Sequence, residues 1–310
     1  MRIGIDLGGT KTEAVVIDDA SRILARRRVP TPRNDYAATL QTICALVAAL
    51  EAEVGARGLP VGAGTPGARS PATGRMKNCN STWLNDRPLL EDLEARLGPR
   101  VRIANDADCL ALSEATDGAG AGARCMFAAI LGTGVGGGIA IEGRLLSGPN
   151  AIAGEWGHNP LPWPRVEWGE VPGPLGWDGR HGAIEVWCSG GGIAADHQRV
   201  TGELLRSEQI AERAAAGDAA AQATLARWED RLARAFASVI NLLDPDVIVV
   251  GGGLSRLGRL YENVPRLWGE WVFSDRIDTR LVPALHGDAS GVRGAAWLWP
   301  SERPGRAGPG

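Results

Sequence analysis

Short apolar runs and stretches with helical spacing alternate along the chain and predict an α/β protein. Residues 2–5 and 14–17 are apolar runs on either side of Asp-Leu-Gly-Gly-Thr-Lys-Thr, a pattern that predicts a β-hairpin with a glycine-rich turn. Residues 37–50 have apolar side chains at helical spacing and predict a surface helix. The elements predicted next are the strand 61–63, the helix 88–97, the strand 101–104 and a helix over 108–116.

The second half of the chain contains a similar strand, glycine turn and strand. Residues 126–131 and 139–141 are apolar runs that flank the glycine-rich turn 132–138. The two hairpins suggest an internal duplication, although glycine-rich hairpins also arise independently. The elements predicted beyond them are a long helix over 219–243, a strand at 247–250 that leads into Gly251-Gly252-Gly253, and a helix near 257–272.

Strands alternate with helices in both halves, so we expect two sheet-centred lobes. We place the first lobe at residues 1–115, completed by a C-terminal helix at 288–300, and the second lobe at 116–287. The tail 301–310 is rich in Pro, Gly and Arg and is expected to be disordered.

Composition excludes several classes of function. The 310 residues carry a net charge of −3, which argues against a polyanion-binding surface, and no apolar run approaches the length of a membrane span. The five cysteines are far apart and form no C-x-x-C pair, and strand-like sequence begins at residue 2, where a secretory leader would lie. We therefore expect a cytoplasmic protein with reduced thiols that binds neither nucleic acid nor a membrane.

Three glycine-rich turns each follow an apolar strand: Gly8-Gly9, Gly132–Gly138 and Gly251–Gly253. Glycine lets backbone N–H groups close on an anion without a Cβ in the way, so three such turns together favour a nucleotide site over three ordinary tight turns. Gly132, Gly134 and Gly137 have the G-x-G-x-x-G spacing of a dinucleotide fold, but the turn leads into a predicted strand where that fold requires a helix. The chain also lacks a G-x-x-x-x-G-K-[ST] loop.

Asp6 and Lys11 flank the first of these turns. A carboxylate beside a phosphate-binding loop can hold Mg²⁺ directly or through water, and a lysine can contact a terminal phosphate. The alternative is that Asp6 only caps the turn and Lys11 is solvated. Lys11 is one of only two lysines in the chain, which favours the functional interpretation.

Four motifs in order resemble the ROK family of sugar kinases in the actin-like/hexokinase ATPase superfamily. They are Asp6-Leu-Gly-Gly-Thr-Lys-Thr, the loop Leu131–Gly138, Gly154-Glu-Trp-Gly-His and Gly251-Gly-Gly-Leu-Ser. The similarity spans roughly residues 1–300 and is closest to bacterial fructokinases through residues 77–85, 157–163 and 290–299. The resemblance implies two actin-like (ribonuclease H-like) lobes with an interlobe cleft, and a homodimer.

The resemblance also implies that Mg²⁺ and ATP bind on the glycine turns, with Mg²⁺ held through ATP and Asp6 and with adenosine near the third turn. The residues expected to bind the nucleotide are Asp6, Gly8, Gly9, Thr10, Lys11, Gly132, Thr133, Gly134, Gly136, Gly137, Gly252 and Gly253.

Asp106 is the candidate general base for transfer of a phosphoryl group to a sugar hydroxyl. It follows Asn105 at the end of a predicted strand, and the family gives this role to the Asp of its Asn-Asp-Ala motif. A strand-end Asp is often only a helix N-cap, a role that Asp108 also fits. Loop carboxylates, amides and a His suit the hydroxyls of a hexose. The expected sugar-binding residues are Gly67, Asn80, Asn105, Asp106, Glu155, His158 and Glu185.

The chain departs from the family in one motif. Typical members continue with Cys-x-Cys-Gly-x-x-Gly-Cys-x-Glu, in which three cysteines and the preceding His bind a structural zinc. An alignment on Pro172 and Glu185, with an insertion around 177–179, puts Gly173, Leu175 and Ala183 at the cysteine positions. His158 remains, with His181 and Asp178 nearby, but this is a poor zinc ligand set, so we expect no structural zinc. We expect Trp163, Trp168, Trp177 and Trp187 to pack this segment.

The sequence therefore predicts ATP-dependent phosphorylation of a hexose at its primary hydroxyl, with fructose as the favoured acceptor. The alternatives within this class are N-acetylglucosamine, N-acetylmannosamine and glucose. Two alternatives come from other classes. A sugar-responsive repressor needs a helix-turn-helix before the first hairpin, and a non-catalytic sugar sensor would be expected to have lost Asp106.

Overall fold

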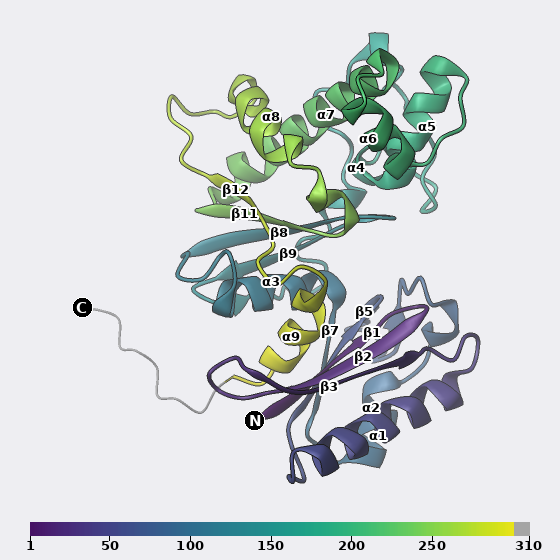
Figure 1. Ribbon diagram of the computed structural model, residues 1–310, viewed down its shortest axis with the longest axis vertical. Coiled ribbons are helices and arrows are strands. Elements are labelled where there is room, and N and C mark those ends of the chain that lie inside the picture. Colours follow the sequence, from purple (N-terminus) through teal and green to yellow (C-terminus); the bar gives the residue numbers. More distant parts are fainter. Residues whose placement is uncertain (301–310) are drawn as a thin grey trace. The chain divides into compact units, whose positions relative to one another are not determined.

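The computed structural model describes residues 1–300, so the predicted disordered tail at 301–310 lies outside the described residues. The chain divides into two compact units, which Figure 1 shows. The first contains residues 1–113, 149–151 and the segment from Ala289 on, and the second contains 114–148 and 152–288.

The first unit is built on a five-stranded sheet with the order β3-β2-β1-β4-β7. β1 and β2 form the predicted antiparallel hairpin, β3 pairs antiparallel with β2, and β4 and β7 extend the sheet in parallel with β1. The strands are β1 (Arg2–Leu7), β2 (Lys11–Ile17), β3 (Ile23–Pro30), β4 (Val61–Thr65) and β7 (Val101–Asn105), with a small pair β5 (Ala68–Arg69) and β6 (Met76–Lys77).

Helices cover both faces of this sheet. Alternate residues of β1, Ile3 and Ile5, are buried in a core with Leu40 and Ile43 of α1 (Tyr36–Glu53). On the opposite face α9 (Ser290–Trp297) packs against β1 and β4. A Cβ on Gly62 would lie 1.7 Å from the carbonyl oxygen of Ala295, so only glycine permits this close packing. The remaining helices are α2 (Leu89–Leu97) and η1 (Thr82–Leu84), while α3 (Asp106–Asp117) and η6 (Gly287–Ala289) both span the unit boundary.

The second unit repeats the topology of the first. Its sheet has the order β10-β9-β8-β11-β12, with β8-β9 and β9-β10 antiparallel and with β8-β11 and β11-β12 parallel. The strands are β8 (Cys125–Leu131), β9 (Val135–Ile141), β10 (Arg144–Leu145), β11 (Val247–Gly251) and β12 (Arg280–Pro283). The shared order and strand directions support the internal duplication that the two hairpins suggested.

The predicted long helix forms the core of this unit. α7 (Ala219–Leu243) buries Leu225, Trp228, Leu232 and Phe236 at three- and four-residue spacing, as an amphipathic helix must. The other helices are α4 (Ile184–Cys188), α5 (Gly190–Thr201), α6 (Ser207–Ala215), α8 (Arg259–Leu267), η2 (Trp156–His158), η3 (Val166–Trp168), η4 (Gly253–Arg256) and η5 (Trp268–Glu270).

Several short strands and the helices α4, α5 and α6 were not predicted, and three further differences have a clear physical reason. β3 was not predicted, because only Ala25 of its eight residues is fully buried and arginines occupy the edge strand. The helix predicted near 257–272 is instead α8 followed by η5. α3 begins at Asp106 and not at Asp108, because the Asn105 side chain accepts a hydrogen bond from the Asp108 backbone N–H at 2.6 Å.

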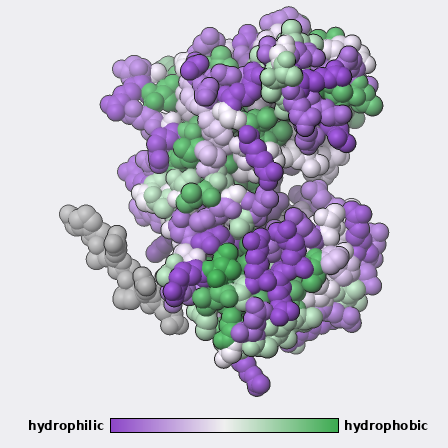
Figure 2. Space-filling view, in the orientation of Figure 1, coloured by the Kyte–Doolittle hydropathy of each residue, from purple (hydrophilic) through white to green (hydrophobic). Residues whose placement is uncertain are grey.

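The surface mixes hydrophobic and hydrophilic residues. The hydrophobic ones form small separate patches among the hydrophilic ones on the face drawn in Figure 2. Within residues 1–300, no helix combines the length and the hydrophobicity needed to cross a bilayer. All five cysteines are free thiols.

Candidate functional site

Two carboxylates of the first unit meet in a cavity of about 290 Å³. The cavity lies at the carboxyl ends of the parallel strands β1, β4 and β7, the edge of an open α/β sheet where ligands bind. Its lining residues are Asp6, Leu7, Gly8, Gly9, Arg33, Thr65, Pro66, Asn80, Ser81, Trp83 and Asp106. We call it the carboxylate cavity.

The protein surroundings raise the pKa of both carboxyl groups. Burial, together with the negative charges of Asp106 and Glu13, raises the pKa of Asp6 to about 6. Desolvation also raises the pKa of Asp106, against a backbone hydrogen bond from Ala107 that lowers it. Both groups therefore bind a proton, or a neutralising cation, more readily than an isolated carboxylate.

Of the residues predicted in this unit, Asp6, Gly8, Gly9, Asn80 and Asp106 line the carboxylate cavity. In the part of the chain that the structure describes, four others lie outside the set that lines it: Thr10, Lys11, Gly67 and Asn105. Thr10 and Lys11 are exposed on the turn. Asn105 caps α3 through its side-chain oxygen, so the N-cap role considered for Asp108 belongs to Asn105.

Sequence reasoning missed Arg33, Thr65, Ser81 and Trp83 of this cavity. Ser81 and Trp83 lie inside the stretch 77–85 that carried the family resemblance, so this motif was a signal that could have identified them. Thr65 ends β4, and a strand end next to the glycine hairpin was a usable signal. Arg33 follows β3, which was not predicted.

The second unit has a different cavity, of about 750 Å³, at its own glycine turn. The turn between β8 and β9 contributes Gly132 and Thr133, η4 contributes Gly253, and Ala194, Leu254 and Leu257 provide apolar surface. The remaining lining residues are Gly190, Gly191, Arg206, Ser207, Glu208, Ala211 and Arg256. We call it the glycine cavity.

Other predicted nucleotide-binding glycines lie outside the lining of this cavity. Gly134, Gly136, Gly137 and Gly252 are not among the residues, within the described chain, that line it. Gly252 has a φ of +84°, and a Cβ there would lie 2.4 Å from the carbonyl oxygen of Leu131. Its role is therefore to let η4 approach β8.

The predictions missed the helices that form much of the glycine cavity. The Gly190 N–H donates to the Gly132 carbonyl at 2.8 Å, which brings the start of α5 to the turn. Ser189 caps α5 by accepting the Gly192 N–H at 3.1 Å. The run Ser189-Gly190-Gly191-Gly192 was a fourth glycine signal, and it was overlooked because it opens a helix and follows no strand.

The structure brings Glu155, His158 and Glu185 of the second unit into one connected group. Glu185 accepts the Val135 N–H at 2.8 Å and the Trp177 indole N–H at 3.0 Å. The His158 ring lies 3.4 Å from Asp178 through Nδ1 and 3.8 Å from Glu155 through Nε2. These side chains are partly exposed, as groups that contact a polar ligand must be.

The predicted packing role of the tryptophans holds for three of the four. Trp187 is buried, Trp163 stacks on Trp271 at 5.1 Å, and the Arg165 guanidinium lies 4.9 Å from the Trp168 ring. Trp177 differs, because its side chain is 68% exposed and its indole N–H donates a hydrogen bond to Glu185.

The residues at the zinc motif do not fit a closed zinc site. An ungapped match on Glu185 keeps both glycines of the pattern, Gly179 and Gly182, and puts Gly176, Asp178 and Ala183 at the cysteine positions. None is a thiolate, and within residues 1–300 no cluster of three or more His, Cys, Asp or Glu is arranged to hold a metal ion.

The geometry favours the ungapped match over the alignment with an insertion. Leu175, which it placed at a cysteine position, is 61% exposed, whereas Asp178 lies beside His158. His181 does not take the place of a ligand next to His158 either, because its Nδ1 lies 2.8 Å from the Gly173 carbonyl oxygen.

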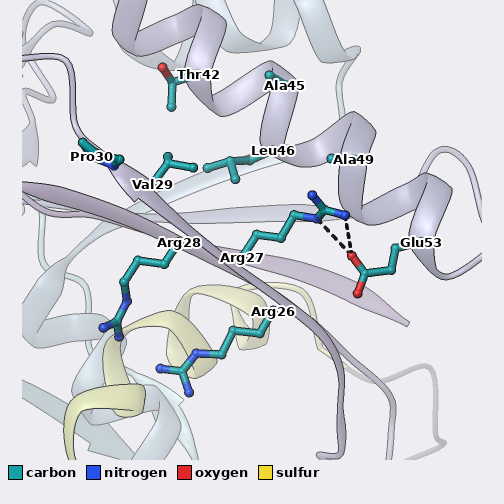
Figure 3. A pocket seen from close by; sticks show the side chains of 10 residues that line it. All are labelled: Arg26, Arg27, Arg28, Val29, Pro30, Thr42, Ala45, Leu46, Ala49 and Glu53. Carbon is teal, nitrogen blue, oxygen red and sulfur yellow. Dashed lines mark hydrogen bonds and ion pairs between the residues drawn. The ribbon is translucent and has the colours of Figure 1, made fainter.

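A further cavity, of about 720 Å³, lies along the edge strand β3. Figure 3 shows Arg27 pointing toward Glu53 of α1, with which it pairs at 2.9 Å, while Arg26 and Arg28 point to the other side of the strand. This cavity contains none of the predicted site residues. Its arginines protect an exposed sheet edge from pairing, which accounts for them without a ligand.

Comparison with known proteins agrees with the geometry. The family model described as ROK family matches residues 2–302. N-acetyl-D-glucosamine kinase of Photobacterium profundum is 39% identical over 304 residues, which cover 96% of this chain and 99% of that protein.

Two solved structures extend the comparison. The ROK hexokinase from Thermus thermophilus is 28% identical with a TM-score of 0.84, and the match covers 95% of this chain and 96% of that one. A ROK family glucokinase from Streptomyces griseus, solved in complex with glucose and AMPPNP, is 29% identical with a TM-score of 0.77 over 96% of this chain and 98% of that one. The fold is that of the actin-like sugar kinases, and the chain belongs to the ROK family.

Proposed function

We propose that this protein is an ATP-dependent sugar kinase that transfers the γ-phosphoryl group of ATP to the primary hydroxyl of a hexose. The observation that carries the proposal is the carboxylate cavity, where Asp6 and Asp106 meet beside the Gly8-Gly9 turn. Kinase names among relatives of nearly full length support it.

Asp106 is the proposed general base. Phosphoryl transfer to an alcohol requires a group that accepts the hydroxyl proton as the oxygen attacks. Desolvation raises the pKa of Asp106, which makes its carboxylate a stronger base than an exposed Asp. The hydrogen bond that its Oδ1 accepts from the Ala107 N–H at 2.8 Å holds the carboxyl group at the start of α3.

Asp6 and the Gly8-Gly9 turn are proposed to hold Mg²⁺ and the phosphates of ATP. A carboxylate oxygen is the ligand type that Mg²⁺ prefers, directly or through water, so the residues present fit this cation. The bound cation would neutralise charge on the transferring phosphoryl group. Lys11 begins β2 next to this turn and lowers the pKa of Asp6 by its charge, so it remains the proposed contact for a terminal phosphate.

The glycine cavity is proposed to bind the nucleoside. Its apolar surface at Ala194, Leu254 and Leu257 suits a purine ring, and Thr133 on the glycine turn is proposed to offer its backbone N–H to phosphate. Thr10, Gly134, Gly136, Gly137 and Gly252 are proposed to shape the turns around the nucleotide.

The proposed sugar-binding residues are distributed over both units. Asn80 and Asp106 lie in the carboxylate cavity of the first unit, and Glu155, His158 and Glu185 form the connected group of the second. Gly67 and Asn105 are proposed to act through the backbone around them, since the Asn105 oxygen is engaged with the Asp108 N–H.

N-acetyl-D-glucosamine is the acceptor that the relatives favour. A curated relative that covers nearly the whole chain carries that activity in its name. Fructose is the second candidate, because residues 78–85 and 158–163 resemble fructokinases more than amino-sugar kinases. The resemblance also supports a homodimer, which sedimentation of the purified protein would test.

A coupled ADP-release assay over free hexoses and N-acetylhexosamines tests the proposal. We expect ADP release that requires both Mg²⁺ and a sugar, with the highest kcat/KM for N-acetyl-D-glucosamine or fructose. An Asp106→Asn variant serves as the control for contaminating kinases. A protein that phosphorylates none of the sugars would contradict the proposed function, whereas a different preferred sugar would change only the acceptor.

A further inference from the structure

The turn at Trp177 and Asp178 contacts two of the proposed sugar-binding side chains. The Trp177 indole N–H donates to Glu185 Oε1 at 3.0 Å, and the edge of its ring meets His158 with 5.5 Å between ring centroids. Asp178 Oδ2 lies 3.4 Å from His158 Nδ1. One short turn thus limits the positions of both His158 and Glu185.

Hydrogen bonds fix this turn internally. The Gly176 N–H donates to the Arg180 carbonyl at 2.7 Å, and the Gly179 N–H donates to the Gly176 carbonyl at 3.1 Å. Asp178 Oδ1 accepts the Arg180 N–H at 3.0 Å. One carboxylate oxygen of Asp178 is therefore anchored to its own turn while the other faces His158.

A buried ion cluster fixes the segment that leads into the turn. Glu170 is 3% exposed and accepts hydrogen bonds from Arg231 at 2.7 Å and from Arg234 at 2.9 Å. Both arginines are fully buried on α7. Removing one member of such a cluster is costly, because it leaves a buried charge without a partner, so the segment is tied firmly to the core helix.

On the basis of the proposed function, we infer that Trp177 and Asp178 are positioning residues that orient Glu185 and His158 for sugar binding. In the family pattern a zinc ion beside the same His and Glu would restrain this loop, and the donors here do not fit that metal. Asp178 occupies a cysteine position in the ungapped match and contacts the His directly. The Asp178 carboxylate and the Trp177 indole thus restrain this loop where a zinc site would restrain it in the family pattern.

Kinetics of Trp177→Phe and Asp178→Ala test the inference. Trp177→Phe keeps the ring beside His158 and removes the N–H that Glu185 accepts. We expect each variant to raise the KM for the sugar about 5- to 10-fold, the loss of roughly one hydrogen bond, while kcat, the KM for ATP and the melting temperature stay near parent values. Asp178→Asn keeps the shape of the side chain and one acceptor oxygen, which can still accept the Arg180 N–H, so it should raise the KM for the sugar less than Asp178→Ala does.

Leu175→Ala is the matched control, since Leu175 lies in the same loop and is 61% exposed. Sugar KM values within twofold of the parent for both variants would overturn the inference, as would an equal rise in the control. One equivalent of zinc in the parent protein would also overturn it. A parent that phosphorylates no sugar defeats the proposed function and the inference with it, whereas an active parent with unaffected variants defeats the inference alone.

Discussion

The two sheets of this protein share one topology but carry different chemistry at the same turn. In the first unit the hairpin strand β1 ends in Asp6-Leu7, and in the second β8 ends in Ile130-Leu131. Leu7 and Leu131 each form the last strand pair before the turn, with Thr12 and Val135. The carboxylate of the first hairpin thus corresponds to an isoleucine in the second.

Parallel strands beyond the two hairpins also end in different residues. β7, the outer parallel strand of the first sheet, leads into Asp106, which places a second carboxylate near Asp6. β11, the strand next to β8 in the second sheet, ends at the run Gly251-Gly252-Gly253 beside an apolar cavity. A repeated backbone therefore supplies the turn geometry, and a few side chains at strand ends decide the chemistry. We propose that the first unit supplies charge and proton transfer and that the second unit supplies nucleoside binding.

Removing the proposed base should give the largest effect on this division of roles. We expect Asp106→Asn to lower kcat at least about 100-fold, a typical contribution of a general base, with the KM for the sugar little changed. Asp108→Asn, two residues along α3, is the matched control. Steady-state kinetics of both variants provide the measurement, and near-parent turnover of Asp106→Asn would remove Asp106 from the role.

Asp6→Asn should separate stability from activity. The folded pKa of Asp6 is about 6 against an ordinary 3.8, so between these values the folded protein holds a proton that the unfolded chain has released. The contribution of Asp6 to the free energy of unfolding is therefore fully present below about pH 4. It decreases as the pH rises through about 6, by about 3 kcal/mol at most.

The Asn side chain carries no charge and escapes this loss. We expect Asp6→Asn to raise the free energy of unfolding at pH 7, with little difference from the parent at pH 4, and to lose most Mg²⁺-dependent activity. Denaturant unfolding at the two pH values measures the effect. A variant less stable than the parent at pH 7 would contradict the assignment of Asp6 as a carboxylate whose buried charge destabilises the fold.

Filling the glycine cavity should weaken nucleotide binding alone. Ala194 on α5 lines this cavity, whereas its neighbour Ala195 is exposed. We expect Ala194→Leu to raise the KM for ATP about 10-fold, with the KM for the sugar unchanged, and Ala195→Leu to match the parent. Equal effects on both substrates would show that the cavity is not a nucleoside site.

Removing metal should have the smallest effect on stability. Because the donors around His158 do not fit a closed zinc site, we expect far less than one equivalent of zinc in the purified protein. EDTA should leave the melting temperature unchanged, since no metal contributes to folding. Elemental analysis gives the answer directly, and stoichiometric zinc would require a ligand set that includes Asp178 and His158.

The sequence predicted the sheets and the carboxylates well because both follow local rules. Apolar runs, glycine turns and strand-end Asp residues are enough to identify β1, β2, β8, β9, Asp6 and Asp106. β3 was not predicted, because an edge strand buries few side chains and its arginines interrupt the alternation of apolar and polar residues.

The missed site residues depend on contacts between distant segments. Gly190 reaches Gly132 across 58 positions of chain, and the indole of Trp177 bonds Glu185 only after the turn has formed. Local patterns do not encode such contacts. The ungapped zinc motif, with Gly179 and Gly182 in register, was a readable signal that would have placed Asp178 beside His158.

The most direct test of the proposed kinase activity is identification of the product. The parent protein is incubated with Mg²⁺, ATP and the best acceptor of the panel, and the products are resolved by ³¹P NMR. The account predicts one equivalent of a sugar 6-phosphate for each ADP, and none with Asp106→Asn. ADP with inorganic phosphate in place of a sugar phosphate, or phosphorylation at a secondary hydroxyl, would contradict it.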